Sequence, residues 1–117
     1  EVRCESYLTE DAELVIAAYG TTARISRSVI NNLRQEGHKV GLIRPITLWP
    51  YPYAEFKKLP GSVKHILVTE MNCGQMIDDV KVATESKIPV SFYGRTGGMS
   101  PSVKEIETQC RKLLGLE

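Results

Sequence analysis

The alternation of short β-rich runs with stretches of helical periodicity constrains this chain more than any other feature. Runs of branched and aromatic residues indicate strands at residues 13–19, 39–44, 63–69 and 89–93. Apolar residues that recur every three or four positions predict helices at residues 22–36, 74–85 and 101–113, with a short helix at 53–58. Strands that alternate with helices in this way are typical of a parallel sheet covered by helices. The sequence therefore predicts an α/β fold.

A weaker pattern at residues 2–7 predicts a fifth strand at the edge of the sheet. Arg3 and Glu5 give this segment one polar side, which is typical of an edge strand. The 117 residues, 42% hydrophobic and 25% charged, suit one hydrophobic core rather than a disordered segment. We therefore predict one domain over residues 1–117. Because the chain opens at Glu1 without an initiator Met, we also expect it to be part of a longer protein, although processing would look the same.

Composition also limits the class of partner. Fifteen Lys and Arg are interspersed with fourteen Asp and Glu, so the sequence has no basic patch of the kind that binds nucleic acid. The longest apolar runs, at residues 14–19 and 66–68, fall far short of the roughly 20 residues that span a bilayer. The first residues show no signal-peptide pattern. We therefore expect a soluble, cytoplasmic protein that binds neither nucleic acid nor membrane.

Polar and glycine-rich residues follow the carboxyl end of each predicted strand, which is the edge where open α/β sheets bind ligands. The first such turn is Gly20-Thr21-Thr22, with Arg24 nearby. Free backbone N–H groups and the positive end of a helix dipole would suit a phosphate or carboxylate there. A plain helix N-cap is the simpler interpretation, because the phosphate-binding motifs G-x-x-x-x-G-K-[ST] and G-x-G-x-x-G are absent.

Arg44 ends the second of these strands. Its guanidinium would suit bidentate binding of an anion, and equally a pair with a neighbouring carboxylate or carbonyl. The proline-rich loop after it carries Trp49 and Tyr51. These aromatic side chains are candidates for an interface with another chain, with packing onto the domain's own core as the alternative.

The turn after the third strand holds a carboxylate, two amides and a thiol: Glu70, Asn72, Gln75 and Cys73. This set invites a catalytic base or nucleophile. However, Cys73 has no histidine in its own segment, and His65 lies within a strand, where packing or hydrogen bonding is the expected role. The last loop adds Arg95. We predict no catalytic residue, and we keep four of these side chains as candidate contacts to an anion or a cleft: Glu70, Asn72, Gln75 and Arg95.

The cysteines give no sign of a metal centre. The chain has three, Cys4, Cys73 and Cys110, and no two of them form a C-x-x-C pair. No predicted helix or strand offers paired His or Asp side chains at metal-ligand spacing. We therefore expect neither a metal site nor an iron–sulfur cluster in this chain.

Four strand-end motifs, taken in order, resemble one known domain. They are AYGTTAR (18–24), VGLIRPITLWP (40–50), VTEMNCGQM (68–76) and YGRTGG (93–98). From about Asp11 onward the chain is similar to the C-terminal domain of the α subunit of 2-oxoacid:ferredoxin oxidoreductases. It resembles more loosely the C-terminal domains of transketolases and of 2-oxoacid dehydrogenase β subunits. The chain departs from the family's common residues at Thr21, Cys73 and Thr96, where Ser, Met and Pro are usual.

The resemblance implies a three-layer α/β/α domain with a mixed, mostly parallel five-stranded sheet whose first strand is antiparallel at one edge. Enzymes of this family use thiamine diphosphate to decarboxylate a 2-oxoacid, pass electrons through iron–sulfur clusters to ferredoxin, and release acyl-CoA. Their cofactor and cluster sites lie in other domains or subunits. The resemblance thus implies a non-catalytic assembly domain at the C-terminus of an α subunit, beside the substrate or CoA cleft. Its partners would be the β subunit and, where present, γ and δ subunits.

A self-contained small-ligand module of flavodoxin or receiver type is the alternative. A receiver needs acidic residues at its strand ends, whereas Asp78 and Asp79 fall inside a predicted helix. A flavin-binding loop rich in Ser and Thr is not evident either. The length of the natural chain separates the two hypotheses, because an oxidoreductase subunit of at least two domains requires roughly 200 further residues.

Overall fold

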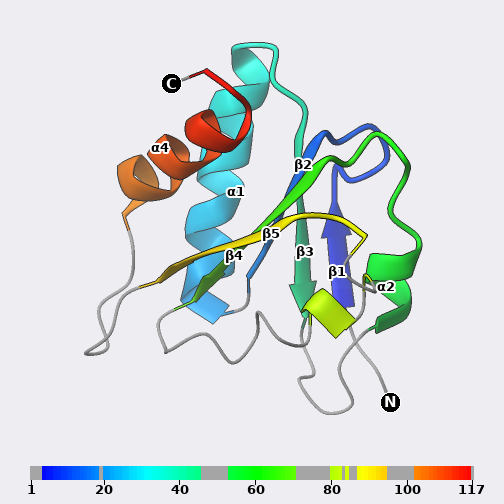
Figure 1. Cartoon of the computed structure of the whole chain (residues 1–117). Coiled ribbons are helices and arrows are strands. Elements are labelled where there is room, and N and C mark those ends of the chain that lie inside the picture. Colours follow the sequence, from blue (N-terminus) through cyan, green and yellow to red (C-terminus); the bar gives the residue numbers. More distant parts are fainter. Residues whose placement is uncertain are drawn as a thin grey trace.

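The computed structural model describes residues 4–18, 20–45, 53–70, 80–82, 84, 87–94 and 102–116. Within these residues the strands are β1 (Cys4–Tyr7), β2 (Leu14–Ala17), β3 (Val40–Pro45), β4 (His65–Glu70) and β5 (Val90–Gly94). The helices are α1 (Gly20–Gln35), α2 (Tyr53–Lys57) and α4 (Val103–Leu113), and residues 80–82 are helical as well. The predicted alternation of strands and helices is confirmed wherever the chain is described (Figure 1).

The strands form one five-stranded sheet in the order β1-β3-β2-β4-β5. Strands β2 to β5 run parallel to one another, whereas β1 pairs with β3 in the antiparallel sense at one edge. This arrangement confirms the mixed sheet and the antiparallel first strand. The strand predicted at residues 2–7 is present at the edge over Cys4–Tyr7, where Glu5 and Ser6 are exposed, and residues 2 and 3 lie outside the described residues.

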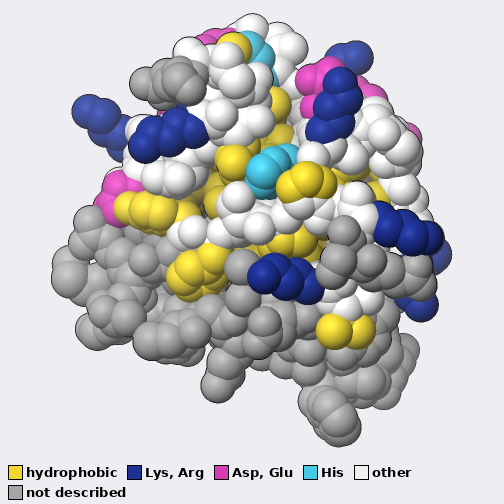
Figure 2. All heavy atoms as spheres, viewed as in Figure 1, with side chains coloured by type: hydrophobic (Ala, Val, Ile, Leu, Met, Phe, Trp, Pro, Cys, Tyr) yellow, Lys and Arg dark blue, Asp and Glu magenta, His cyan; other side chains and the backbone are white. Residues whose placement is uncertain are grey.

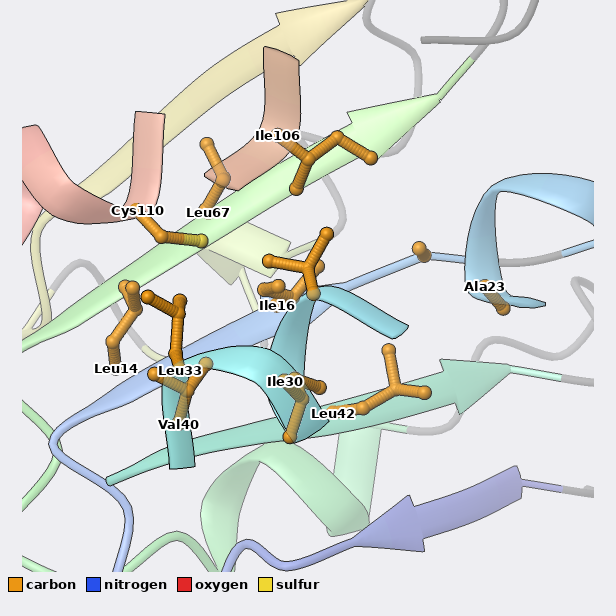
Figure 3. Close-up of a cluster of buried hydrophobic side chains, with 12 residues drawn as sticks. Leu14, Ile16, Ala23, Ile30, Leu33, Val40, Leu42, Leu67, Ile106 and Cys110 are labelled. Atoms are coloured by element: carbon orange, nitrogen blue, oxygen red, sulfur yellow. The ribbon is translucent and has the colours of Figure 1, made fainter. Parts of the chain in front are cut away.

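The two faces of the sheet carry separate cores, because successive strand residues point to opposite sides. On the first face, Ile16, Leu42 and Leu67 pack beneath α1 and α4, as Figure 3 shows. On the second face, Val15 and Val68 pack with Phe56 of α2 and with Val80. Helices therefore cover both sides of the sheet (Figure 1), which confirms the three-layer α/β/α fold.

Helix α1 has the predicted apolar face but not the predicted start. Its inward positions Val29, Ile30 and Leu33 are completely buried. The helix begins at Gly20, two residues before the start predicted at residue 22. The reason is that Gly20 adopts φ 63° and turns the chain into the helix before Thr22. The Thr22 carbonyl oxygen accepts a hydrogen bond from Ser26 Oγ at 2.8 Å, so Thr22 already lies inside the helix.

Helix α4 is closed at its start by a capping box. The Oγ atom of Ser102 accepts a hydrogen bond from the backbone N–H of Glu105 at 3.1 Å, and the Glu105 carboxylate accepts one from the N–H of Ser102 at 3.3 Å. Ile106 and Cys110 are buried beneath the helix, as the predicted stripe required. Pro101 lies outside the described residues, as do residues 74–79 of the helix predicted at 74–85.

Candidate functional site

The parallel strands all end at one edge of the sheet, which we call the carboxyl edge. After β2 the chain enters α1 on one face, whereas after β4 it reaches Val80 on the opposite face. Because β2 and β4 are neighbours, the direction of the connections reverses between them. Open α/β sheets bind ligands in the crevice outside such a switch point. The ends of β2 and β4 are therefore where a site is expected.

Thr69 stands at this switch point. The pairing of Ala17 with Val68 places Thr69 beside Ala18, and on its other side Thr69 pairs with Tyr93. The Thr69 side chain is completely buried, yet its Oγ1 atom has no hydrogen-bond partner among the described residues. An unpaired buried hydroxyl destabilises a fold by about 1–3 kcal/mol, so such groups are uncommon. The hydrogen-bonding capacity of this hydroxyl is therefore unused within the described part of the chain.

The first turn of α1 follows directly from the same crevice. A Cβ atom added at Gly20 would meet no atom within 4 Å apart from its own chain neighbours, so the space beside the helix start is open. The first turn contains no acidic residue, and Arg24 is exposed. Helix N-termini of this kind favour anions. Gly20 and Thr22 lie in the first turn with Arg24 just beyond, but the Thr22 side chain is buried and that of Thr21 lies outside the described residues, so their role as anion contacts stays a prediction.

Arg44 pairs with a carboxylate of the edge strand. Its Nη1 atom lies 2.8 Å from Oε1 of Glu5, which faces it across the antiparallel pair of β1 and β3. Of the two interpretations that the sequence left open, pairing with a neighbouring carboxylate is the one that the structure contains. Arg44 therefore links the edge strand β1 to β3 through an ion pair.

The model of the pyruvate:ferredoxin oxidoreductase core domain II matches residues 12–106 of the chain. The chain belongs to this family. The ketoisovalerate oxidoreductase subunit VorB of Methanothermobacter marburgensis is 38% identical over 115 residues, which are 98% of this chain and 32% of that protein. This core domain II thus spans about a third of the length of that relative.

Solved structures agree with the family. The 2-oxoglutarate:ferredoxin oxidoreductase from Magnetococcus marinus, with 2-oxoglutarate, coenzyme A and succinyl-CoA bound, has a TM-score of 0.81 at 26% identity, over 94% of this chain and 19% of that chain. An inactive β4 tetramer of a split-gene transketolase has a TM-score of 0.78 at 17% identity, over 97% of this chain and 42% of that chain. The second likeness concerns the fold alone. The resemblance carried by the four strand-end motifs is confirmed.

Several predicted site residues of this core domain II lie where the structure gives no description. Glu70 closes β4, but its side chain lies outside the described residues. The others outside the described residues are Trp49, Tyr51, Asn72, Cys73, Gln75 and Arg95. Their candidate roles at the carboxyl edge stay predictions.

The described thiols of the core domain II, Cys4 and Cys110, are poor nucleophiles. Burial, with Glu55 and Glu5 nearby, raises the pKa of Cys4 to about 12. Burial and Glu107 raise the pKa of Cys110 to about 12 as well. Both thiols therefore stay protonated at neutral pH.

His65 has the structural role expected of it. Its Nε2 atom and Ser91 Oγ share a hydrogen bond of 2.8 Å, and burial lowers the pKa of the imidazole. The described residues contain no group of three His, Cys, Asp or Glu side chains that could hold a metal ion.

Two features escaped sequence reasoning. One is Thr69, whose only signal was a hydroxyl at the end of an apolar strand. The other is a cavity of about 510 Å³ between α2 and the segment before β5, which Phe56, Val63, Thr84 and Ile88 line with others. No periodic pattern could have found it, because its walls come from segments far apart in the sequence.

The described surface shows no membrane span and no basic patch on the face shown. No described helix is long and apolar enough to cross a bilayer. In Figure 2 the Lys and Arg side chains of the described residues are spread around the visible face rather than gathered in one place. A nucleic-acid footprint of the usual kind would concentrate them.

Proposed function

We propose that this chain is a non-catalytic assembly domain of a thiamine-diphosphate-dependent 2-oxoacid:ferredoxin oxidoreductase. The complex would convert a 2-oxoacid, CoA and oxidised ferredoxin into acyl-CoA, CO₂ and reduced ferredoxin. The family match over residues 12–106 carries the proposal. The domain would be one unit of an α subunit, near its C-terminus, in a cytoplasmic complex.

The chemistry of the described side chains supports a non-catalytic role. Cys4 packs against the α2 side of the sheet, whereas Cys110 lies in the core beneath α4, so they cannot ligate one cluster together. Their raised pKa values also disfavour the thiolate that an iron–sulfur cluster requires. The described donor set does not fit a cluster. Thiamine diphosphate supplies the carbanion chemistry of such enzymes, and other parts of the complex would hold it.

The partners of the domain would be other parts of the same assembly. A chain that spans about a third of its relative leaves most of the expected subunit to pack against it. The β subunit and, where present, γ and δ subunits would complete the complex, and ferredoxin and CoA would reach the domain only through it. The names of the relatives differ in substrate, ketoisovalerate in one and 2-oxoglutarate in another. We expect the residues that contact the 2-oxoacid to lie outside this domain.

Co-purification of the natural full-length chain tests the proposal. Mass spectrometry of the purified material should find partner subunits, and the complex should reduce ferredoxin or a viologen dye only when a 2-oxoacid and CoA are both present. Reactions that lack either compound are the controls. A chain with neither partners nor this activity would instead favour the small-ligand module.

A second experiment separates assembly from chemistry. Cys4→Ala and Cys110→Ala should leave turnover per assembled complex unchanged, because neither thiol would touch the reacting atoms. A large fall in turnover with full assembly would contradict the non-catalytic role of the described thiols.

A further inference from the structure

We propose that Thr69 and the first turn of α1 bind the oxyanion group of a small molecule, either a phosphate or a carboxylate. The site lies at the switch point between β2 and β4. The inference goes beyond the proposed assembly role, and it does not depend on that role, because it concerns binding and not turnover.

The hydroxyl of Thr69 points to the correct side of the sheet for such a site. Side chains alternate along β4, so Thr69 faces the same way as Leu67, which packs in the core beneath α1 and α4. Its neighbour Ala18 also belongs to this core, and Gly20 starts α1 two positions later. Figure 3 shows Leu67 and Ala23 on the two elements that border the crevice. The unpaired hydroxyl therefore lies next to the start of α1.

The backbone of α1 supplies the complementary donors. The first four N–H groups of an α-helix have no partner within the helix, and α1 has 16 residues whose dipoles add at this end. No acidic side chain in the first turn opposes an incoming anion. The open space beside Gly20 gives that anion room to approach.

The donor set selects the class of ligand. A threonine hydroxyl and helix N–H groups can all donate to oxygen, and the positive end of the dipole repels cations. The exposed guanidinium of Arg24 adds a positive charge near the helix start. Phosphate and carboxylate oxygens accept such hydrogen bonds strongly. A cationic ammonium or guanidinium group would offer these donors no acceptor and would be repelled by the positive end of the helix.

Amide hydrogen exchange in the natural full-length protein, kept in its native assembly, measures this binding directly. Inorganic phosphate and acetate are titrated separately against chloride at equal ionic strength. One or both should slow exchange at residues 20–24, because the unpaired N–H groups of the first turn gain an acceptor. Protection by phosphate alone would identify a phosphate site, and protection by acetate alone a carboxylate site.

Two variants and a matched control decide the role of Thr69. Thr69→Val keeps the shape of the side chain but removes the hydroxyl. It should lower the anion affinity measured in the exchange titration about tenfold or more. Thr69→Ser should retain most of it. Thr84→Val removes another buried threonine hydroxyl, one that already bonds the Val80 carbonyl at 3.0 Å, and should leave anion affinity unchanged.

Three results would overturn the inference. Neither anion protects residues 20–24, or chloride protects them equally, or Thr69→Val binds phosphate and acetate as tightly as the parent protein. Loss of 2-oxoacid-dependent activity is not among the readouts, so failure here leaves the assembly role untouched, and failure of the assembly role leaves this site untouched.

Discussion

The two edges of the sheet differ in how completely their polar groups are used. At the amino edge, where the parallel strands begin, Arg34 donates hydrogen bonds to the carbonyl oxygens of Leu8 at 2.7 Å and Val40 at 2.9 Å, and it pairs with Asp11 at 2.8 Å. At the carboxyl edge, the Thr69 hydroxyl has no partner among the described residues and the start of α1 is open. Paired polar groups thus stabilise the amino edge, whereas we expect the unpaired donors of the carboxyl edge to serve binding.

A second arginine strengthens the amino edge. Arg111 of α4 lies 2.7 Å from Glu36, just past the end of α1, and 2.9 Å from Glu107. The two helices on that face are therefore fastened where they end, whereas their N-termini lie at the carboxyl edge. Changes at the amino edge should consequently lower stability, and changes at the carboxyl edge should act mainly on binding.

Gly41→Ala should have the largest effect. A Cβ atom at this position would lie 2.7 Å from the Leu8 carbonyl oxygen, which is backbone and cannot move aside easily. Overpacking of this kind should lower the free energy of unfolding by about 3 kcal/mol in urea denaturation. Gly61→Ala is the control: its Cβ would meet nothing within 4 Å, and the change should stay within about 0.5 kcal/mol. Equal effects at both glycines would show that the close approach of Leu8 is not a constraint.

Arg34→Met should come next. Methionine fills similar volume but leaves the Leu8 and Val40 carbonyl oxygens without their donor, which should lower the unfolding free energy by about 2 kcal/mol. Lys104→Met, at an exposed position of α4, should change it by less than about 0.5 kcal/mol. If the two variants unfold at the same urea concentration, the hydrogen bonds of Arg34 do not stabilise the amino edge as we describe.

Thr69→Val should have the opposite sign. Removing a buried hydroxyl without a partner should raise the unfolding free energy by about 1 kcal/mol. Thr84→Val removes a paired hydroxyl and should lower it by about the same amount. A loss of stability in Thr69→Val would mean that this hydroxyl has a structural partner, and the contrast between the edges would disappear.

Acid should weaken the amino edge, with the smallest effect of the four. A hydrogen bond from Arg34 lowers the pKa of Asp11, and one from Arg111 lowers the pKa of Glu36. A lowered folded-state pKa means that the unfolded chain binds more protons, so the contribution is complete above the ordinary pKa and declines as pH falls through the lowered one. The melting temperature should therefore decrease when the pH is lowered below about 4.5, which is near the ordinary pKa of a carboxyl group. The double variant Asp11→Asn with Glu36→Gln should drop less steeply, and identical profiles would exclude these pairs as the cause.

Sequence reasoning succeeded where the pattern of side chains determines the element. The apolar spacing of Val29, Ile30 and Leu33 fixed the buried face of α1, and strand–helix alternation fixed the parallel sheet. The start of α1 was misplaced because it depends on the backbone angle of Gly20, which leaves no periodic signal. The antiparallel sense of β1 came from the family resemblance and not from periodicity.

The site was harder to predict because it depends on which strands become neighbours. Arg44 pairs with Glu5 only because β1 folds back beside β3, a relation that local sequence does not encode. Thr69 was missed because threonine is common in strands, and nothing local indicates that its hydroxyl will lack a partner. By contrast, the start of a helix near Gly20 was visible in the sequence, since it depends only on a strand that leads into a helix, and the anion-binding role of this turn stays a prediction.

The outer strand β5 bears on whether the protein aggregates while it folds. It ends the strand order, and among the described residues no strand pairs with its outer side. Phe92 on this strand is 37% exposed, whereas on the opposite edge Glu5 and Ser6 bond to Arg44 and Glu55. Unprotected apolar edges are templates for aggregation. The yield of soluble protein should therefore depend on how soon another polypeptide segment covers the outer side of β5 in the cell.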